Sequence, residues 1–118
     1  MRDKNDDKRF EYDLKIRKKE QEMDDLDDTL RKYAQQLSDT ADTLQYNQEE
    51  ELYLMIELHE ISSSLGDELE DLMFLQNQSK HFFNEQLDSL EFFRKQNIRK
   101  LDDEREILHE ERSRLPWD

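Results

Sequence analysis

The chain has 118 residues, of which 42% are charged and 33% are hydrophobic, with no cysteine, one glycine and one proline. This composition is typical of long helices and argues against a deep closed core, and the lack of cysteine excludes disulfides and thiolate chemistry. The formal net charge of −14 argues against nucleic acid and anionic membranes as partners.

The first half of the chain carries one apolar stripe at helical spacing. Ile16, Met23, Leu30, Leu37 and Leu44 recur every seven residues, which is the period of a coiled coil. Other residues that project in the same direction extend the stripe: Tyr12, Leu26, Tyr33, Ala34, Ala41, Leu52 and Met55. We therefore expect a first helix over about residues 6–61.

The only cluster of helix-breaking residues lies at residues 62–67. It contains three serines that can cap a helix, Gly66, which can adopt a positive φ, and Asp67 with Glu70 in capping-box spacing. We place the reversal here. The turn residues are then Ser64, Leu65 and Gly66. A second polar stretch at residues 38–43 keeps the apolar stripe in register and is expected to stay helical.

The second half carries a matching stripe, which predicts a second helix over about residues 68–114. Its members fall within one arc of about 100° around a helix. They are Leu65, Leu69, Leu72, Phe83, Leu87, Leu90, Ile98, Leu101, Leu108 and Leu115. Two stripes joined by a turn predict an all-α fold: a coiled-coil-like antiparallel two-helix hairpin that forms a single domain over residues 1–118.

Charge is distributed unevenly along the chain. Residues 20–78 carry two Lys or Arg and seventeen Asp or Glu, whereas the two ends are richer in basic residues. A turn at the predicted position places residue i level with about residue 128 − i, so that Glu20 lies near Arg105 and Lys19 lies near Glu110. Such pairs would help to set the antiparallel register. The alternative is that these charges simply form solvated faces.

The end of the second helix is marked by a proline. Leu115 continues the stripe, Pro116 stops the helix and Trp117 follows. Trp117 either folds back over the open end of the hairpin, at the level of Phe10 and Tyr12, or serves as an aromatic anchor for a partner.

Several large apolar residues do not fit either stripe. They are Tyr46 and Tyr53 in the first helix, and Phe74, Leu75, Phe82, Phe92, Phe93 and Ile107 in the second. A lone hairpin also cannot bury the runs 52–56 and 72–75, which are apolar nearly all round the helix, so we expect a further helix or helix pair to cover this surface. The expected contacts are Tyr46, Tyr53, Phe74, Leu75, Phe82, Phe92, Phe93 and Trp117. The alternative occupant is a second copy of the chain in a homodimeric four-helix bundle.

No catalytic, cofactor-binding or metal-binding constellation is evident in the sequence. Glu106 and His109 have the spacing of a carboxylate-bridged di-iron ligand pair, but such sites need a second copy of the motif, and none is present. We expect all three histidines to face solvent. The sequence therefore predicts a non-enzyme without cofactor or metal.

The chain shows no signal of membrane insertion. No apolar run approaches the roughly 18 to 20 residues of a membrane span, and residues 1–7 are charged where a signal peptide needs an apolar segment. We therefore expect the protein to be cytoplasmic after synthesis, and we expect any export to use a route that does not require a cleavable signal.

A short, acidic, cysteine-free helical hairpin with its only glycine at the turn resembles the small helical proteins of bacterial type VII secretion. The Trp-x-Gly turn of WXG-type members corresponds here to Ser64, Leu65 and Gly66, so that the glycine matches and the tryptophan does not. Their Tyr-x-x-x-Asp/Glu export signal follows the second helix, whereas the only match here, Tyr46 to Glu50, lies in the first. The chain is most similar to the LXG-associated α-helical proteins that lack their own signal.

This resemblance implies a function as well as a fold. The chain would act as a targeting factor or chaperone that binds the helical N-terminal domain of an LXG toxin together with a second small helical protein, and that is itself cytoplasmic or co-exported. The alternatives are a homodimeric coiled-coil scaffold or adaptor and, from net charge alone, an acidic mimic that blocks a nucleic-acid-binding protein.

Overall fold

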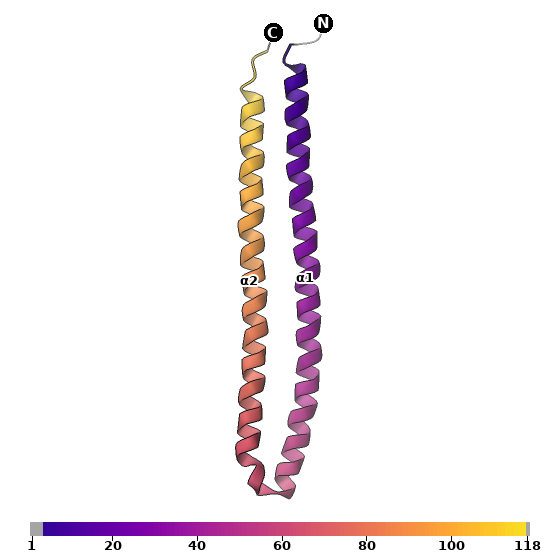
Figure 1. The fold of residues 1–118 in the computed structure, drawn as a ribbon, viewed down its shortest axis with the longest axis vertical. Coiled ribbons are helices and arrows are strands. Elements are labelled where there is room, and N and C mark those ends of the chain that lie inside the picture. Colours follow the sequence, from indigo (N-terminus) through magenta and orange to yellow (C-terminus); the bar gives the residue numbers. More distant parts are fainter. Residues whose placement is uncertain (1–3, 118) are drawn as a thin grey trace. The chain divides into compact units, whose positions relative to one another are not determined.

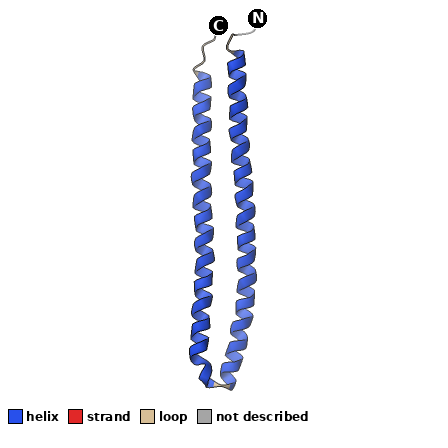
Figure 2. Cartoon of the chain, viewed as in Figure 1, coloured by secondary structure: helices blue, strands red, loops and turns tan. Residues whose placement is uncertain are grey.

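The computed structural model describes residues 4–117. They form two long helices, α1 (Asp6–Ile61) and α2 (Gly66–Ser113), joined by the short 3-10 helix η1 (Ser63–Leu65) (Figure 1). Figure 2 shows that almost all of the described chain is helical. The predicted fold class, an antiparallel two-helix hairpin with its turn near residues 62–67, is confirmed.

The chain divides into two compact units. The terminal unit comprises Met1–Arg31 and Glu91–Asp118, and the turn unit comprises Lys32–Leu90. In each unit a segment of α1 packs against a segment of α2 that runs in the opposite direction. Each unit therefore has a single helix–helix contact, which we call its seam.

The seam consists of the two apolar stripes that the sequence predicts. Every member of the stripes is at least half-buried except Tyr33, which is 60% exposed. The expectation for Tyr33 was wrong because the neighbouring Ala34 occupies the seam and the larger ring points away. Ile16 is the only buried hydrophobic side chain among residues 4–117. A helix with one neighbour can bury only one stripe, so no deep core forms.

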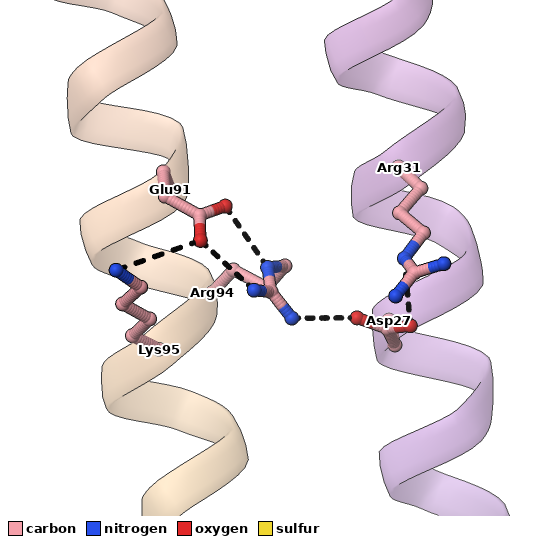
Figure 3. Close-up of polar contacts among 5 residues, drawn as sticks. All are labelled: Asp27, Arg31, Glu91, Arg94 and Lys95. Carbon is pink, nitrogen blue, oxygen red and sulfur yellow. Dashed lines mark hydrogen bonds and ion pairs between the residues drawn. The ribbon is translucent and has the colours of Figure 1, made fainter.

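Polar side chains also occupy the seam, and sequence reasoning missed them. In the turn unit the Gln76 side-chain amide donates a hydrogen bond of 2.8 Å to the Gln48 carbonyl. In the terminal unit Arg94 donates to Asp27 at 2.8 Å and also pairs with Glu91 on its own helix (Figure 3). Long polar side chains can lie here because a two-helix seam is open to water on both sides.

The cross-seam ion pairs correct the predicted register. Asp27 was expected level with about residue 101 but pairs with Arg94, and Lys19 pairs with Glu104 at 2.7 Å instead of lying near Glu110. The partners of Asp27 and Lys19 therefore lie nearer the turn than predicted, although the connection itself, residues 62–65, lies where the sequence places it. The pairing of opposite charges across the seam is nonetheless present in the terminal unit.

Two further ion pairs cross the same seam. Arg112 pairs with Asp13 at 2.7 Å, and Arg105 lies 3.9 Å from Glu20, as the sequence predicts. These pairs are only partly shielded from solvent, so each contributes at most about 1 kcal/mol. Their main effect is on the register, since a slip of the helices would break all of them together.

The turn is built differently from the expectation. Ser62 is extended, with φ −137° and ψ 108°, and Gly66 already has helical φ and ψ values of −60° and −43°. No residue of the described chain has a positive φ. Asp67 lies inside the first turn of α2, so it cannot act as an N-cap and the predicted capping box is wrong. One extended residue followed by a 3-10 turn is enough to reverse the chain.

The remaining turn residues close this connection. Ser62 caps η1 through its backbone conformation, without a side-chain capping hydrogen bond. Its hydroxyl oxygen lies 2.8 Å from that of Ser64. Leu65 is half-buried and starts the seam of α2, whereas Ser64 is exposed.

A polar clasp joins the two ends of the hairpin. The Arg9 guanidinium lies 3.3 Å from the centre of the Trp117 ring, in cation–π geometry. Asn5 and Arg9 donate hydrogen bonds of 2.6 and 2.9 Å to the Pro116 carbonyl oxygen. Trp117 thus folds back over the open end, although onto buried Arg9 rather than onto Phe10.

Replacing Gly66 with alanine tests the structure of the turn. A Cβ atom at Gly66 would lie 3.7 Å from Cε1 of His59, which is an ordinary contact, and the backbone is already helical. We therefore expect Gly66→Ala to raise the free energy of unfolding by up to about 1 kcal/mol through the lower entropy of the unfolded chain. Thermal melts followed by circular dichroism measure this change. A clear loss of stability would mean that the glycine needs a positive φ.

The Lys19–Glu104 pair gives the seam a pH dependence. The hydrogen bond from Lys19 lowers the pKa of Glu104 below its ordinary value of 4.5 and raises the pKa of Lys19. A lowered carboxyl pKa stabilises the folded chain above the ordinary value, and the contribution is lost as the pH falls through the lowered pKa.

Replacing Lys19 with methionine should therefore have a pH-dependent effect. We expect Lys19→Met to lower the melting temperature at pH 7, and the difference from the wild type to shrink below pH 4.5 as Glu104 becomes protonated. Lys18→Met, at an exposed position of the same helix, is the control and should change little at either pH. An effect of Lys19→Met that stays constant down to pH 2 would contradict the role of the pair.

Candidate partner-binding surface

The predicted contact residues all lie outside the seam. Their exposed fractions range from 49% for Phe93 to 74% for Trp117. The others in this range are Tyr46, Tyr53, Phe74, Leu75, Phe82 and Phe92. Ile107, which also lies off the stripes, is 52% exposed. For the members within the helices, this exposure was predicted correctly from the helical angle, whereas Trp117 lies beyond the end of α2. The role of all of them as contacts stays a prediction. Large apolar side chains grouped on a surface mark an interaction site more often than isolated ones do.

In the turn unit, two tyrosines share one face of α1. Tyr46 and Tyr53 are seven residues apart, and together with Glu49, Glu50 and Leu54 they line a shallow hollow of about 450 Å³. A hydrogen bond to the Glu50 carboxylate, with the charge of that group, raises the pKa of Tyr46. The two rings therefore lie in a negatively charged setting.

On α2 of the same unit, Phe74 and Phe82 line a second hollow, of about 640 Å³. His81 and Glu85 also line it, and they lie 3.1 Å apart. Phe82 packs edge-on against Phe83, a seam residue, with ring centres 5.7 Å apart. The aromatic rings at this end of α2 thus extend from the seam to the outer surface.

The terminal unit carries a third hollow of different charge. Phe92, Ile107 and Met23 contribute its apolar lining, and charged side chains of both signs, among them Lys95 and Asp103, complete it. Its volume is about 1130 Å³. The structure therefore distributes several of the predicted contacts over an acidic hollow and two hollows of mixed charge, while Leu75, Phe93 and Trp117 line none of the three.

The predicted contacts do not include every exposed apolar residue. Leu54, Leu58 and Ile61 of α1 and Met73 of α2 are exposed as well, and Leu54 lines the hollow of the tyrosines. Leu54 and Met73 belong to the runs 52–56 and 72–75, which the sequence already marks as apolar nearly all round the helix, whereas Leu58 and Ile61 lie outside them. A stripe chosen only for its distance from the seam does not include every member of such a run.

The histidines require one correction. His81 and His109 are exposed as expected, whereas His59 is half-buried at the turn end of the seam. Its Nδ1 atom is buried and makes no hydrogen bond within the part of the chain that the structure describes. His59 follows the spacing of the seam residues. The expectation that it faces solvent was wrong because only apolar residues were expected in the seam.

Comparison of the chain with protein-family models, with curated proteins and with solved structures gives no match. Among residues 4–117, no three His, Asp or Glu side chains gather in a way that could hold a metal ion. Neither described helix contains a stretch that is long and apolar enough to cross a membrane.

Paired substitutions distinguish the exposed rings from the seam. Phe82→Ser and Phe93→Ser should lower the free energy of unfolding by less than about 1 kcal/mol, because both rings are already about half exposed. Leu87→Ala and Leu101→Ala should each cost about 2 kcal/mol, the lower end for core leucines, since both lie half-buried in the seam. Thermal melts give the comparison. If the phenylalanine variants melt at temperatures as low as the leucine variants, those rings contribute to the seam, and their assignment to the outer surface is wrong.

Proposed function

We propose that this chain is a non-catalytic targeting factor that binds helical domains of other proteins. Its partners in this proposal are the helical N-terminal domain of an LXG toxin and a second small helical protein. The supporting observation is the set of exposed rings on the turn unit, where Tyr46, Tyr53, Phe74 and Phe82 are all more than half exposed while the seam is already filled. Such a surface is suited to helix packing.

The form of the hollows also supports binding rather than catalysis. They are shallow surfaces of aromatic, amide and charged side chains along one helix or between two helices. Sites for small substrates are usually concave and enclose most of the ligand. A helix laid along such a surface makes use of rings spaced by seven residues, as Tyr46 and Tyr53 are.

The energetics favour more than one contact. Burying the remaining exposed area of Tyr46, Tyr53, Phe74, Leu75 and Phe82 contributes roughly 1 to 1.5 kcal/mol each, or about 5 to 8 kcal/mol in total. Association costs about 4 to 15 kcal/mol in lost translational and rotational freedom. The apolar rings of the turn unit therefore need help from charge or from a second partner, which agrees with a heteromeric complex of three proteins.

Binding of a toxin domain tests the proposal. The gene of this chain should lie beside one for an LXG toxin, and the purified chain should bind the helical N-terminal domain of that toxin. Phe82→Ser should weaken the complex by about tenfold, as a peripheral aromatic contact would. Phe10→Ser is the matched control, because this ring is equally exposed but lies in the terminal unit, outside the three hollows.

Isothermal titration calorimetry and size-exclusion chromatography provide the measurements. Equal losses from Phe82→Ser and Phe10→Ser would contradict a specific role for the turn unit. A chain that forms a stable dimer by itself and binds no toxin domain would instead favour a homodimeric coiled-coil scaffold.

A further inference from the structure

The outward face of α1 in the turn unit is organised as a second seam without a partner. Asp39, Tyr46, Tyr53 and Glu60 follow one another at seven-residue spacing, so they share one stripe of the helix. All four are exposed. The stripe has two tyrosines at its centre and a carboxylate at each end.

Acidic residues flank this tyrosine stripe on both sides. Asp42 and Glu49 lie along one edge, and Glu50 and Glu57 lie along the other, again seven residues apart. All four are exposed, and Glu49 and Glu50 line the hollow that contains both tyrosines. In coiled coils the residues at these flanking positions decide which partner is accepted.

The carboxylates of this face are not neutralised by other side chains of the described residues. Asp39 and Glu49 accept hydrogen bonds from the uncharged side chains of Gln35 and Gln45. None of the six acidic residues of the stripe and its flanks forms an ion pair with a cation of residues 4–117. By contrast, carboxylates of the terminal unit such as Asp27 and Glu104 are paired. The turn unit thus keeps unpaired negative charge beside its exposed rings.

The charge of the whole turn unit points in the same direction. It contains thirteen Asp or Glu and two Lys or Arg, a net charge of −11. Two copies that met through this face would bring two such charges together, which disfavours self-association. Lys and Arg, by contrast, can pair with the flanking carboxylates and place their cations over the tyrosine rings.

We propose that the tyrosine stripe of α1 binds an amphipathic helix whose apolar ridge packs on Tyr46 and Tyr53 and whose flanks carry Lys or Arg. This inference rests on the proposed function, since it assumes that the turn unit is a docking surface, and it adds the chemistry of the partner. The charge of the turn unit disfavours a second copy of the chain as the occupant of this face.

A library of helical peptides tests the charge preference directly. Each peptide carries leucines at the two apolar heptad positions, and each flanking position encodes Lys or Glu with equal frequency. The full chain is the bait. We expect the recovered peptides to carry Lys over Glu by about threefold or more at the flanks, and a recovered peptide to bind about tenfold more weakly in 0.5 M than in 0.05 M salt.

Substitutions in the chain separate this inference from the proposed function. Replacing both Tyr46 and Tyr53 with serine should reduce binding of a selected peptide by about tenfold or more, whereas Tyr33→Ser, at an exposed tyrosine of the same helix outside the stripe, should not. Replacing both Glu49 and Glu50 with lysine should reverse the preference toward peptides with Glu at the flanks. Circular dichroism confirms that each variant keeps its helicity.

Two failures are distinguishable. Binding that is lost in the tyrosine variant but shows no preference for Lys, before or after charge reversal, would keep the docking surface and overturn the basic partner. Binding that is indifferent to the tyrosines would overturn the docking surface itself. Recovery of no peptide, or a wild-type dimer in sedimentation velocity that the tyrosine variant abolishes, would also overturn the inference.

Discussion

The structure depends on the fact that each helix has only one neighbour to pack against. A single helix–helix contact removes water from one stripe of each helix and leaves the rest of the surface exposed. Ile16 is accordingly the only buried hydrophobic side chain of the described residues, and the leucines of the seam are half-buried. Because so little apolar surface is buried, polar contacts across the seam help to specify how the helices align, which a packed core does in larger proteins.

The clearest case is the register of the two helices. Leucines at seven-residue spacing can slip by one heptad and pack nearly as well, so apolar contact alone specifies the register weakly. In the terminal unit, Arg94 with Asp27 and Lys19 with Glu104 are satisfied together in only one alignment. Each pair contributes little free energy. Their combined loss on slippage is what separates the observed alignment from its neighbours.

The same constraint explains why the exposed rings are informative. A two-helix hairpin has no room to bury aromatic side chains away from the seam, so rings such as Tyr53 and Phe74 have no structural task within their own unit. The charge around them differs between units: carboxylates surround the tyrosines of the turn unit, while cations and carboxylates together, such as Lys95 and Asp103, line the hollow beside Phe92 in the terminal unit. The two units therefore offer chemically different surfaces to partners.

The sequence by itself determined the helices, the position of the turn and the division between seam and exposed rings. These follow from residue spacing, because the angle of a side chain around a regular helix depends only on its position in the chain. Tyr46 and Phe82 could be placed on the outside for this reason alone. The one stripe residue placed wrongly, Tyr33, lies at the edge of the arc, where its neighbour Ala34 fits the seam better.

Only the tertiary structure decided the register, the conformation of the turn and the polar members of the seam. Asp27 and Lys19 meet partners nearer the turn than the predicted alignment places them, and the spacing of leucines along one helix does not report such an offset. Whether Gly66 is helical, or whether Arg9 lies under Trp117, depends on which groups meet once the chain has reversed. The spacing of residues along one helix fixes the direction in which each side chain projects. Which residue it meets across the seam depends on the geometry of both helices together.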